Sequence, residues 1–230
     1  MRWVRDLSGR FPKRPHYDVD ELDRACADLI RELQLTRSPG YPVTTDDLAV
    51  LIEQRAEDLD LYADLTEEGA DVEAVTDFVP GERPRVRINH KLSEDPRRAH
   101  RLRTTLAHEL GHVVFHNFIW WFDQGTLDAA TAAALSPRCH RRRLPSAGST
   151  DWMEWQANYA AGALLMPIEA IAEFWPAESA VWVRSYAARR RISHTQHTFD
   201  VSAQAASVRL LQLGRLTRRP TAILRSPIPH

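Results

Sequence analysis

The chain has few cysteines and no long apolar run. Its two cysteines, Cys26 and Cys139, are far apart in the sequence and give no disulfide framework, which excludes a small secreted scaffold. No apolar stretch approaches the roughly 20 residues that a membrane helix needs. The N-terminal MRWVRDLSGR has charge but no apolar core behind it, which argues against a signal peptide. We therefore expect a cytoplasmic protein with no membrane partner.

The composition is that of a folded protein with an uneven charge. With 43% hydrophobic residues, the 230-residue chain can bury a sizeable core as one large domain or two small ones. The net charge of −1 hides an asymmetry, because residues 1–80 carry −10 and residues 81–230 carry +9. Nine arginines in the last fifty residues indicate an acidic partner such as nucleic acid, but a solvated arginine-rich surface explains them too and is favoured.

Hydrophobic spacing and turn residues predict mostly helical elements. Helices are expected at about residues 18–34, 44–57, 94–116, 152–165, 168–190 and 202–213. Alternating residues such as VRIN at 86–89 predict a small sheet near residues 58–90. We expect an extended arm over residues 1–17 and irregular structure over 117–150.

The segment TLAHELGHVV at residues 105–114 carries the chemistry. His108 and His112 are four residues apart, which on a helix places them about 40° apart around the axis, so both imidazoles can bind one zinc ion. Glu109 is badly aimed for a ligand, but it can reach a water molecule at the metal. Two histidine ligands and a glutamate general base are typical of zinc peptidases. Gly111 is unfavourable inside a helix by roughly 1 kcal/mol, which indicates that another element, such as a strand edge, approaches closely.

A catalytic zinc site needs a third protein ligand and an open position. His116 lies about 12 Å along the helix from His108, so it cannot bind the same ion and is expected to pack or to support the site. The downstream carboxylates are Asp123, Asp128, Asp151, Glu154 and Glu169. The sequence favours Glu154, because its predicted helix is mostly apolar and a buried carboxylate needs a cation.

TLAHELGHVVFH together with the later EWQANYAAGALLMP resembles the ImmA/IrrE family of metallo-endopeptidases. The family pattern is HELGH followed by E-x-x-A-N-x-x-A-x-x-LLMP, which residues 154–167 match. The resemblance implies that Glu154 is the third zinc ligand. Many members have a second glutamate where this chain has Gln156, so only one carboxylate is available here. Weaker similarity, including FDVSAQAASVRLLQLGRL, extends the resemblance to about residues 40–215, although the stretch between His112 and Glu154 is long for the family.

The resemblance implies a zinc-dependent endopeptidase that cleaves a regulatory protein, normally a DNA-binding repressor of the helix-turn-helix type, to switch gene expression. With Zn²⁺ held by His108, His112 and Glu154, Glu109 would take a proton from the attacking water and pass it to the leaving amine. No clear repressor domain is present in the sequence. The alternative is a non-hydrolytic regulatory or DNA-binding module that retains a zinc site, and Glu109 discriminates, because a pure binder would not need it.

We therefore expect an α+β, zincin-like metallopeptidase fold, mostly helical, with a small sheet packed on the HExxH helix. Residues 1–40 would form an N-terminal arm and helix, and residues 41–175 the peptidase domain. Residues 176–230 would form a basic helical segment that could resemble a helix-turn-helix. A scaffold role for this last helix pair is favoured over DNA binding. The arginines that would contact phosphates in the DNA-binding case are Arg184, Arg189, Arg190, Arg191 and Arg209.

Five further residues are candidates for supporting roles in the site. A donor to the developing oxyanion is expected, and Tyr159, His140 and His116 are the candidates. Asn158, one turn after the third ligand, is expected to hydrogen-bond the HELGH helix. Cys139 is flanked by arginines, which favour a thiolate, and this thiolate could occupy the open zinc position and hold the enzyme inactive.

Overall fold

The computed structural model describes residues 1–36, 40–122, 138–142 and 151–218. The chain divides into two compact units, Met1–Pro167 and Ile168–His230, which are called the first and second units below. The described residues form a mixed α/β structure in which helices predominate. No helix among them is long and apolar enough to cross a membrane.

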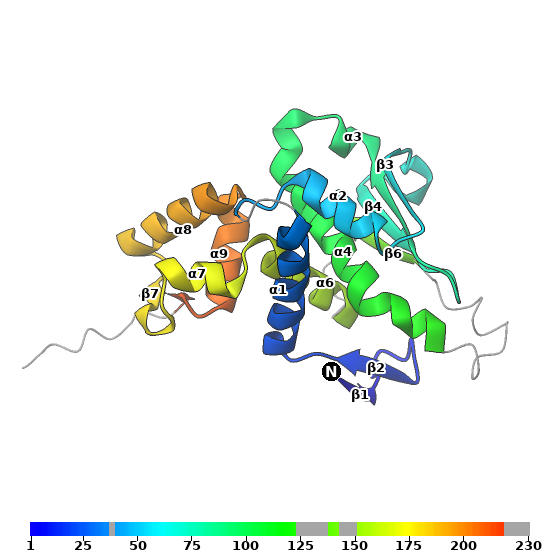
Figure 1. The fold of residues 1–230 in the computed structure, drawn as a ribbon, viewed down its shortest axis with the longest axis horizontal. Coiled ribbons are helices and arrows are strands. Elements are labelled where there is room, and N and C mark those ends of the chain that lie inside the picture. The colour runs from blue at the N-terminus through cyan, green and yellow to red at the C-terminus, as the bar shows by residue number, and fades with distance from the viewer. Residues whose placement is uncertain (37–39, 123–137, 143–150, 219–230) are drawn as a thin grey trace, which may run out of the picture. The chain divides into compact units, whose positions relative to one another are not determined.

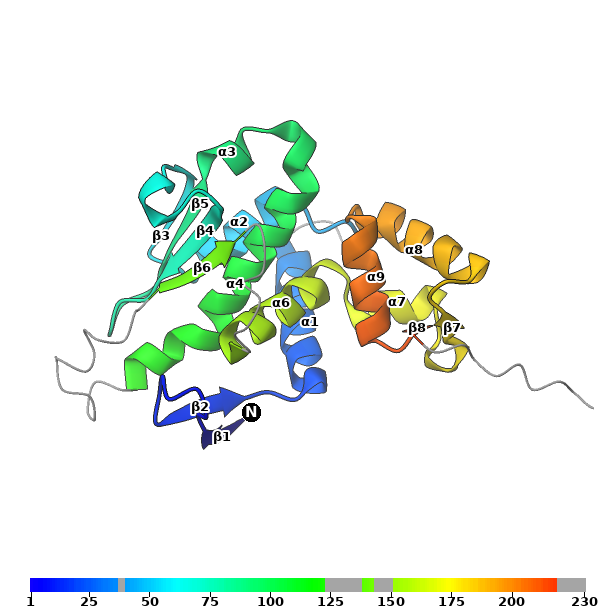
Figure 2. The same cartoon turned by 180° about the vertical axis from the view of Figure 1, so that it is seen from behind.

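Helix α4 (Ala99–Phe122) occupies the centre of the first unit. The four-stranded sheet lies on one side of it, and helices α1 (Val19–Thr36) and α6 (Trp152–Leu165) lie on the other, as Figures 1 and 2 show from opposite sides. Helix α2 (Thr45–Glu53) packs on it as well. The run from Leu106 onward is accordingly buried around most of its circumference, its polar residues His108, Glu109, His112 and His116 included.

The sheet contains β3 (Asp58–Ala63), β4 (Val72–Asp77), β5 (Arg85–Asn89) and β6 (Arg138–Arg142) in the order β3-β5-β4-β6. β3 is parallel to β5, and the other pairs are antiparallel. The first three strands confirm the sheet predicted near residues 58–90. β6 contradicts the irregular structure predicted for residues 117–150, because pairing with β4 makes a strand of a polar segment that has no strand pattern of its own.

Near β4 and β6, one face of the sheet is directed toward α4 and the other packs with apolar residues and a charged network. Thr76 of β4 is paired with Cys139 of β6, and the Thr76 hydroxyl donates to Glu109, so this face looks toward α4. Neighbouring residues along a strand point to opposite faces. Val75 packs with Ala63 and other apolar residues on the far face.

The far face holds β6 in place through a charged network around Glu68. Its carboxylate accepts hydrogen bonds from His140 (2.9 Å) and Arg87 (3.0 Å), and Arg138 pairs with Asp77 at 2.8 Å. The hydrogen bonds from His140 and Arg87 lower the pKa of Glu68 to about 2. The Glu68 side chain is only 17% exposed, so this network contributes more than a surface ion pair does.

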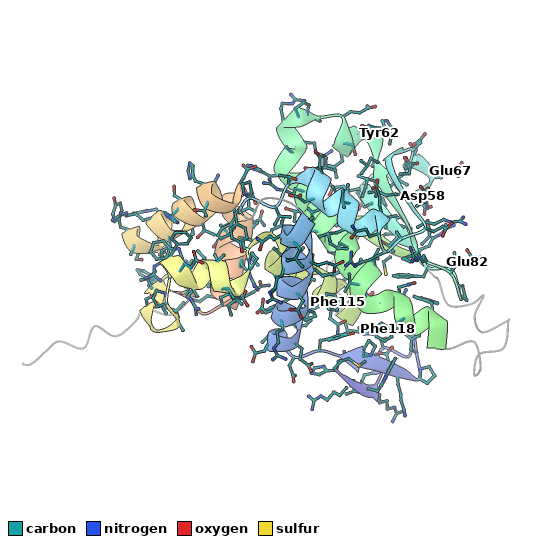
Figure 3. The ribbon with its side chains drawn as sticks, in the orientation of Figure 1. Asp58, Tyr62, Glu67, Glu82, Phe115 and Phe118 are labelled. Atoms are coloured by element: carbon teal, nitrogen blue, oxygen red, sulfur yellow. The ribbon has the colours of Figure 1, made fainter. Side chains whose placement is uncertain are left out.

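The Glu68→Gln variant is expected to be less stable than the parent by about 1–3 kcal/mol at pH 7. Because the folded-state pKa lies below the ordinary 4.5, this contribution is present above pH 4.5 and is lost as the pH falls toward about 2. Urea unfolding of both proteins at pH 7 and pH 3 should show that the difference in their free energies of unfolding is smaller at pH 3. Glu67→Gln, at the exposed neighbour in Figure 3, is the control and should match the parent. A Glu68→Gln gap of equal size at both pH values would contradict the assignment.

The N-terminal residues 1–17, expected as an extended arm, form an antiparallel hairpin of β1 (Arg2–Arg5) and β2 (Lys13–His16). The hairpin packs on the C-terminal half of α4. Figure 3 shows Phe115 and Phe118 on that part of the helix, where Trp3 meets Phe118 edge-on at 5.9 Å. The hairpin and α1 belong to the first unit, in the same compact body as the remainder of residues 1–167.

The predicted helices of the first unit are present with shifted ends. Thr44 caps α2 in a capping box with Asp47. The helix expected at 94–116 instead follows a short α3 (His90–Ser93) and a turn at Pro96–Arg98, and then extends to Phe122. Proline is favoured at the start of a helix and disrupts its interior, which explains the later beginning.

The second unit contains α7 (Ile168–Phe174), a 3₁₀ turn (Ala177–Ser179), β7 (Val181–Trp182), α8 (Tyr186–Phe199), α9 (Ala203–Gln212) and β8 (Leu216–Thr217). The single helix predicted at 168–190 is wrong, because Pro176 interrupts it. Ser202 caps α9, and Gly214 follows it with a positive φ of 67°. The unit begins after Pro167, eight residues before the boundary predicted at residue 175.

The arginines of the second unit do not form one surface. Arg184, Arg189 and Arg190 are exposed, and Arg191 stacks on Trp175 at 4.9 Å. Arg209 is fully buried, so the prediction that it would contact phosphate in a DNA-binding role is wrong. It lies on the inner face of α9, where helical spacing places it beside the apolar residues of that helix.

Candidate metal centre

Three side chains from α4 and α6 converge in the first unit. The Nε2 atoms of His108 and His112 lie 3.1 Å apart. Glu154 places one carboxylate oxygen 3.3 Å from His108 Nε2 and the other 3.2 Å from His112 Nε2. Both histidines are buried, whereas the Glu154 side chain is 32% exposed, so the group is open toward solvent on the α6 side. These three residues form a group that can hold a metal ion.

The spacing of the donor atoms fits a metal. Ligands bound tetrahedrally at about 2.0–2.1 Å lie about 3.3–3.4 Å from one another. The Nε2–Nε2 distance of 3.1 Å and the Nε2–oxygen distances of 3.2 and 3.3 Å are close to this value, with each histidine facing a different oxygen of Glu154. Among the described residues, the group supplies three protein ligands.

Gly111 allows the two ligand-bearing helices to approach. A Cβ at this position would lie 3.1 Å from the Ala157 Cα and 3.2 Å from the Ala160 Cβ of α6. The close approach predicted from Gly111 therefore exists, but its partner is helix α6 and not a strand edge. Small residues on both helices bring Glu154 within reach of the α4 histidines.

Glu109 lies beside the three donors, and only one of its two carboxylate oxygens is hydrogen-bonded to a described residue. Its Oε2 accepts a hydrogen bond from the Thr76 hydroxyl at 2.6 Å, and its Oε1 is buried without a hydrogen-bond partner among the described residues. Burial raises the pKa of Glu109 to about 7, although His112 and Thr76 oppose the shift. A carboxylate that is fixed at one oxygen, open at the other and has a pKa near neutrality is suited to proton transfer.

The pKa values of the two histidines are shifted in opposite directions. Burial and the neighbouring Arg141 together lower the pKa of His108 to about 3, so this ring is neutral near pH 7. Burial also lowers the pKa of His112, but Cys139 and Glu154 outweigh it and raise that pKa well above the ordinary value. The pKa of Glu154 lies well below its ordinary range despite burial, because both histidines face it.

His116 lies one turn beyond His112 and contacts it directly. Their Nδ1 atoms are 2.9 Å apart, and His116 Nε2 lies 3.0 Å from Gln156 Oε1 of α6. Burial and the neighbouring His112 lower the pKa of His116 well below its ordinary value, so the ring is neutral. His116 therefore lies behind the site, as its position on α4 indicated, and cannot reach an oxyanion in front of it. Gln156, which joins it, was not identified from the sequence.

Arg141 of β6, like Thr76 and Gln156, is a site residue that was not identified from the sequence. Its Nη1 donates to His108 Nδ1 at 2.6 Å and to Asn158 Oδ1 at 2.8 Å. Its Nε is buried and without a hydrogen-bond partner among the described residues. Asn158 thus meets the HELGH helix through this guanidinium rather than directly. The direction of Arg141 depends on the register of β6 against β4, which no local motif reports.

The remaining candidates lie in different places. The Tyr159 hydroxyl donates to Asp23 of α1 at 2.7 Å, so it is directed away from the donor group. His140 lies on the far face of the sheet with Glu68, because residues alternate along β6, so neither it nor Tyr159 is brought to the site. Cys139 is buried beside His112, but its sulfur is not among the converging donor atoms of the described residues.

The other carboxylates considered as third ligand are not brought to the histidines. Asp151 caps α6 by accepting from the Met153 amide, and Glu169 lies in α7 of the second unit. Asp123 and Asp128 lie outside the described residues. Comparison with known proteins gives no assignment, because no protein-family model and no curated protein matches the chain.

Proposed function

We propose that this chain is a zinc-dependent endopeptidase of the ImmA/IrrE type, with a zincin-like catalytic unit. The observation that carries the proposal is a group of three donor atoms, one each from His108, His112 and Glu154, that lie within 4.8 Å of one another beside the buried Glu109, one oxygen of which has no hydrogen-bond partner among the described residues. A pure metal-binding module would have no use for Glu109 in that position. Two imidazoles and one carboxylate, with a fourth position open, are a ligand set that suits catalytic zinc.

His108, His112 and Glu154 would hold the zinc. When bound, zinc would polarise the scissile carbonyl and bring the pKa of a water molecule to about 7. Glu109 Oε1 would accept the proton of the attacking water while Thr76 holds Oε2, and would then donate that proton to the leaving amine. Arg141, whose Nη1 contacts His108 and whose buried Nε–H has no partner in the described residues, would be the donor to the negative charge that develops.

The substrate class rests on the resemblance of HELGH and EWQANYAAGALLMP to the family. We propose a helix-turn-helix repressor or another regulatory protein as the substrate, so that cleavage switches gene expression. This activity belongs in the cytoplasm. The alternative remains a non-hydrolytic module that binds a partner through the same unit.

Hydrolysis is tested with a proteome-derived peptide library, in which new N-termini are counted by mass spectrometry. We expect the zinc-loaded protein to generate new termini, chelator treatment to abolish them and added zinc to restore them. A fully zinc-loaded protein that generates no termini would exclude the peptidase and leave the binding module.

A further inference from the structure

A chain of hydrogen bonds runs from the N-terminal hairpin to one of the metal-ligating histidines. It begins at the Pro15 carbonyl oxygen of β2, passes through the Gln156 side chain and the His116 ring, and ends at Nδ1 of His112. The three distances are 3.2, 3.0 and 2.9 Å. Gln156 and His116 are both buried, so no solvent molecule is needed to satisfy these groups.

The direction of each bond follows from the first. A carbonyl oxygen can only accept, so the amide nitrogen of Gln156 donates to Pro15. The amide oxygen of Gln156 therefore faces His116 Nε2, which must carry the proton of that bond. A neutral ring with its proton on Nε2 has a lone pair on Nδ1, and His116 Nδ1 is then the acceptor toward His112.

His112 consequently keeps its proton on Nδ1. Its Nε2 lies 3.1 Å from His108 Nε2 and 3.2 Å from a Glu154 oxygen, where the donor atoms converge. We infer that Gln156 and His116 are positioning residues that keep the His112 proton on Nδ1 and so reserve Nε2 as the metal-binding atom. This inference rests on the proposed function, because it takes the metal centre as given. Outer-shell partners of this kind fix the tautomer and the ring orientation of a ligand histidine.

His108 carries its proton on the other ring nitrogen. Arg141 donates to His108 Nδ1, so the proton of that neutral ring lies on Nε2, which faces a Glu154 oxygen at 3.3 Å. A metal that binds through His108 Nε2 must displace that proton. The hydrogen-bond chain therefore orients His112 alone, and its first member lies in the hairpin, 141 positions from Gln156 along the chain.

The test compares zinc affinity among matched variants. Gln156→Met removes the donor and acceptor while keeping the length, and His116→Phe removes the acceptor of His112. Each is expected to raise the dissociation constant for Zn²⁺ by about 10- to 100-fold, measured by competition with a chromophoric chelator. The double variant should lose no more zinc affinity than the single variant that binds zinc more weakly, because both residues act through one chain of bonds. Tyr159→Phe removes a buried hydrogen bond of the same helix and should bind zinc like the parent.

A second readout is spectroscopic and begins with the parent protein. In the zinc-loaded parent, labelled with ¹⁵N in its histidines, the His112 Nδ1 proton should be protected from exchange, and a scalar coupling should join the two Nδ1 nuclei. Gln156→Met should lose both signals. A parent that binds zinc but shows no coupling, with both variants binding like the parent, would overturn the relay and leave the metal centre standing. A parent that binds no zinc would overturn the proposed function and the relay with it.

Discussion

Glu109→Gln is expected to lower the rate of peptide-bond hydrolysis by about 10³-fold or more and to leave zinc binding unchanged. Thr76 can still donate to the amide oxygen, so the side chain keeps its place in the site. The amide nitrogen then occupies the position of the open Oε1 and cannot accept a proton from water. Turnover per zinc-loaded chain is the measurement, because it separates loss of the base from loss of the metal.

Two controls make the Glu109 result specific. Glu169→Gln makes the same chemical change on the exposed surface of α7 and should cleave like the parent. Thr76→Val leaves the carboxylate but frees Oε2, so we expect a smaller loss than with Glu109→Gln. If Glu109→Gln turned over as fast as the parent at equal zinc occupancy, the base would be another residue and the role assigned to Glu109 would be wrong.

The sequence predicted the ligand-bearing helices well because their signals are local. The apolar residues around HELGH and the nearly uninterrupted apolar run from Ala160 to Met166 indicate buried helices without knowledge of their partners. Gly111 indicated a close approach, and a glycine alone carries no information about the identity of the partner. The nature of that partner, helix α6, required the tertiary structure.

The residues that the sequence did not identify act through contacts between distant segments. β6 contains Arg138, Cys139, His140, Arg141 and Arg142, and this run has neither the alternation nor the β-branched residues of a typical strand. Its pairing with β4 decides that Arg141 faces the histidines while His140 faces Glu68. The bond from Gln156 to Pro15 likewise depends on where the hairpin lies against α4, and no sequence spacing encodes it.

Glu154→Ala is expected to remove zinc from the protein. The parent should hold about one zinc per chain, and the variant should lose more affinity than the 10- to 100-fold that an outer-shell change costs, because a direct ligand is gone. Two histidines that remain cannot enclose the ion, and the carboxylate charge that balances it is absent. Zinc content after dialysis, with the dissociation constant by chelator competition, is the measurement.

The competing carboxylates provide the controls for Glu154. Asp151→Ala should weaken the cap of α6 by about 1 kcal/mol and keep the zinc, and Glu169→Ala should change neither. Circular dichroism checks that each variant is folded before its metal is counted. A folded Glu154→Ala protein that keeps the parent's zinc affinity would show that the third ligand lies elsewhere, and Asp123 and Asp128 would be the next residues to replace. A loss confined to Glu154→Ala would instead tie the metal to the contact between α4 and α6 that Gly111 permits.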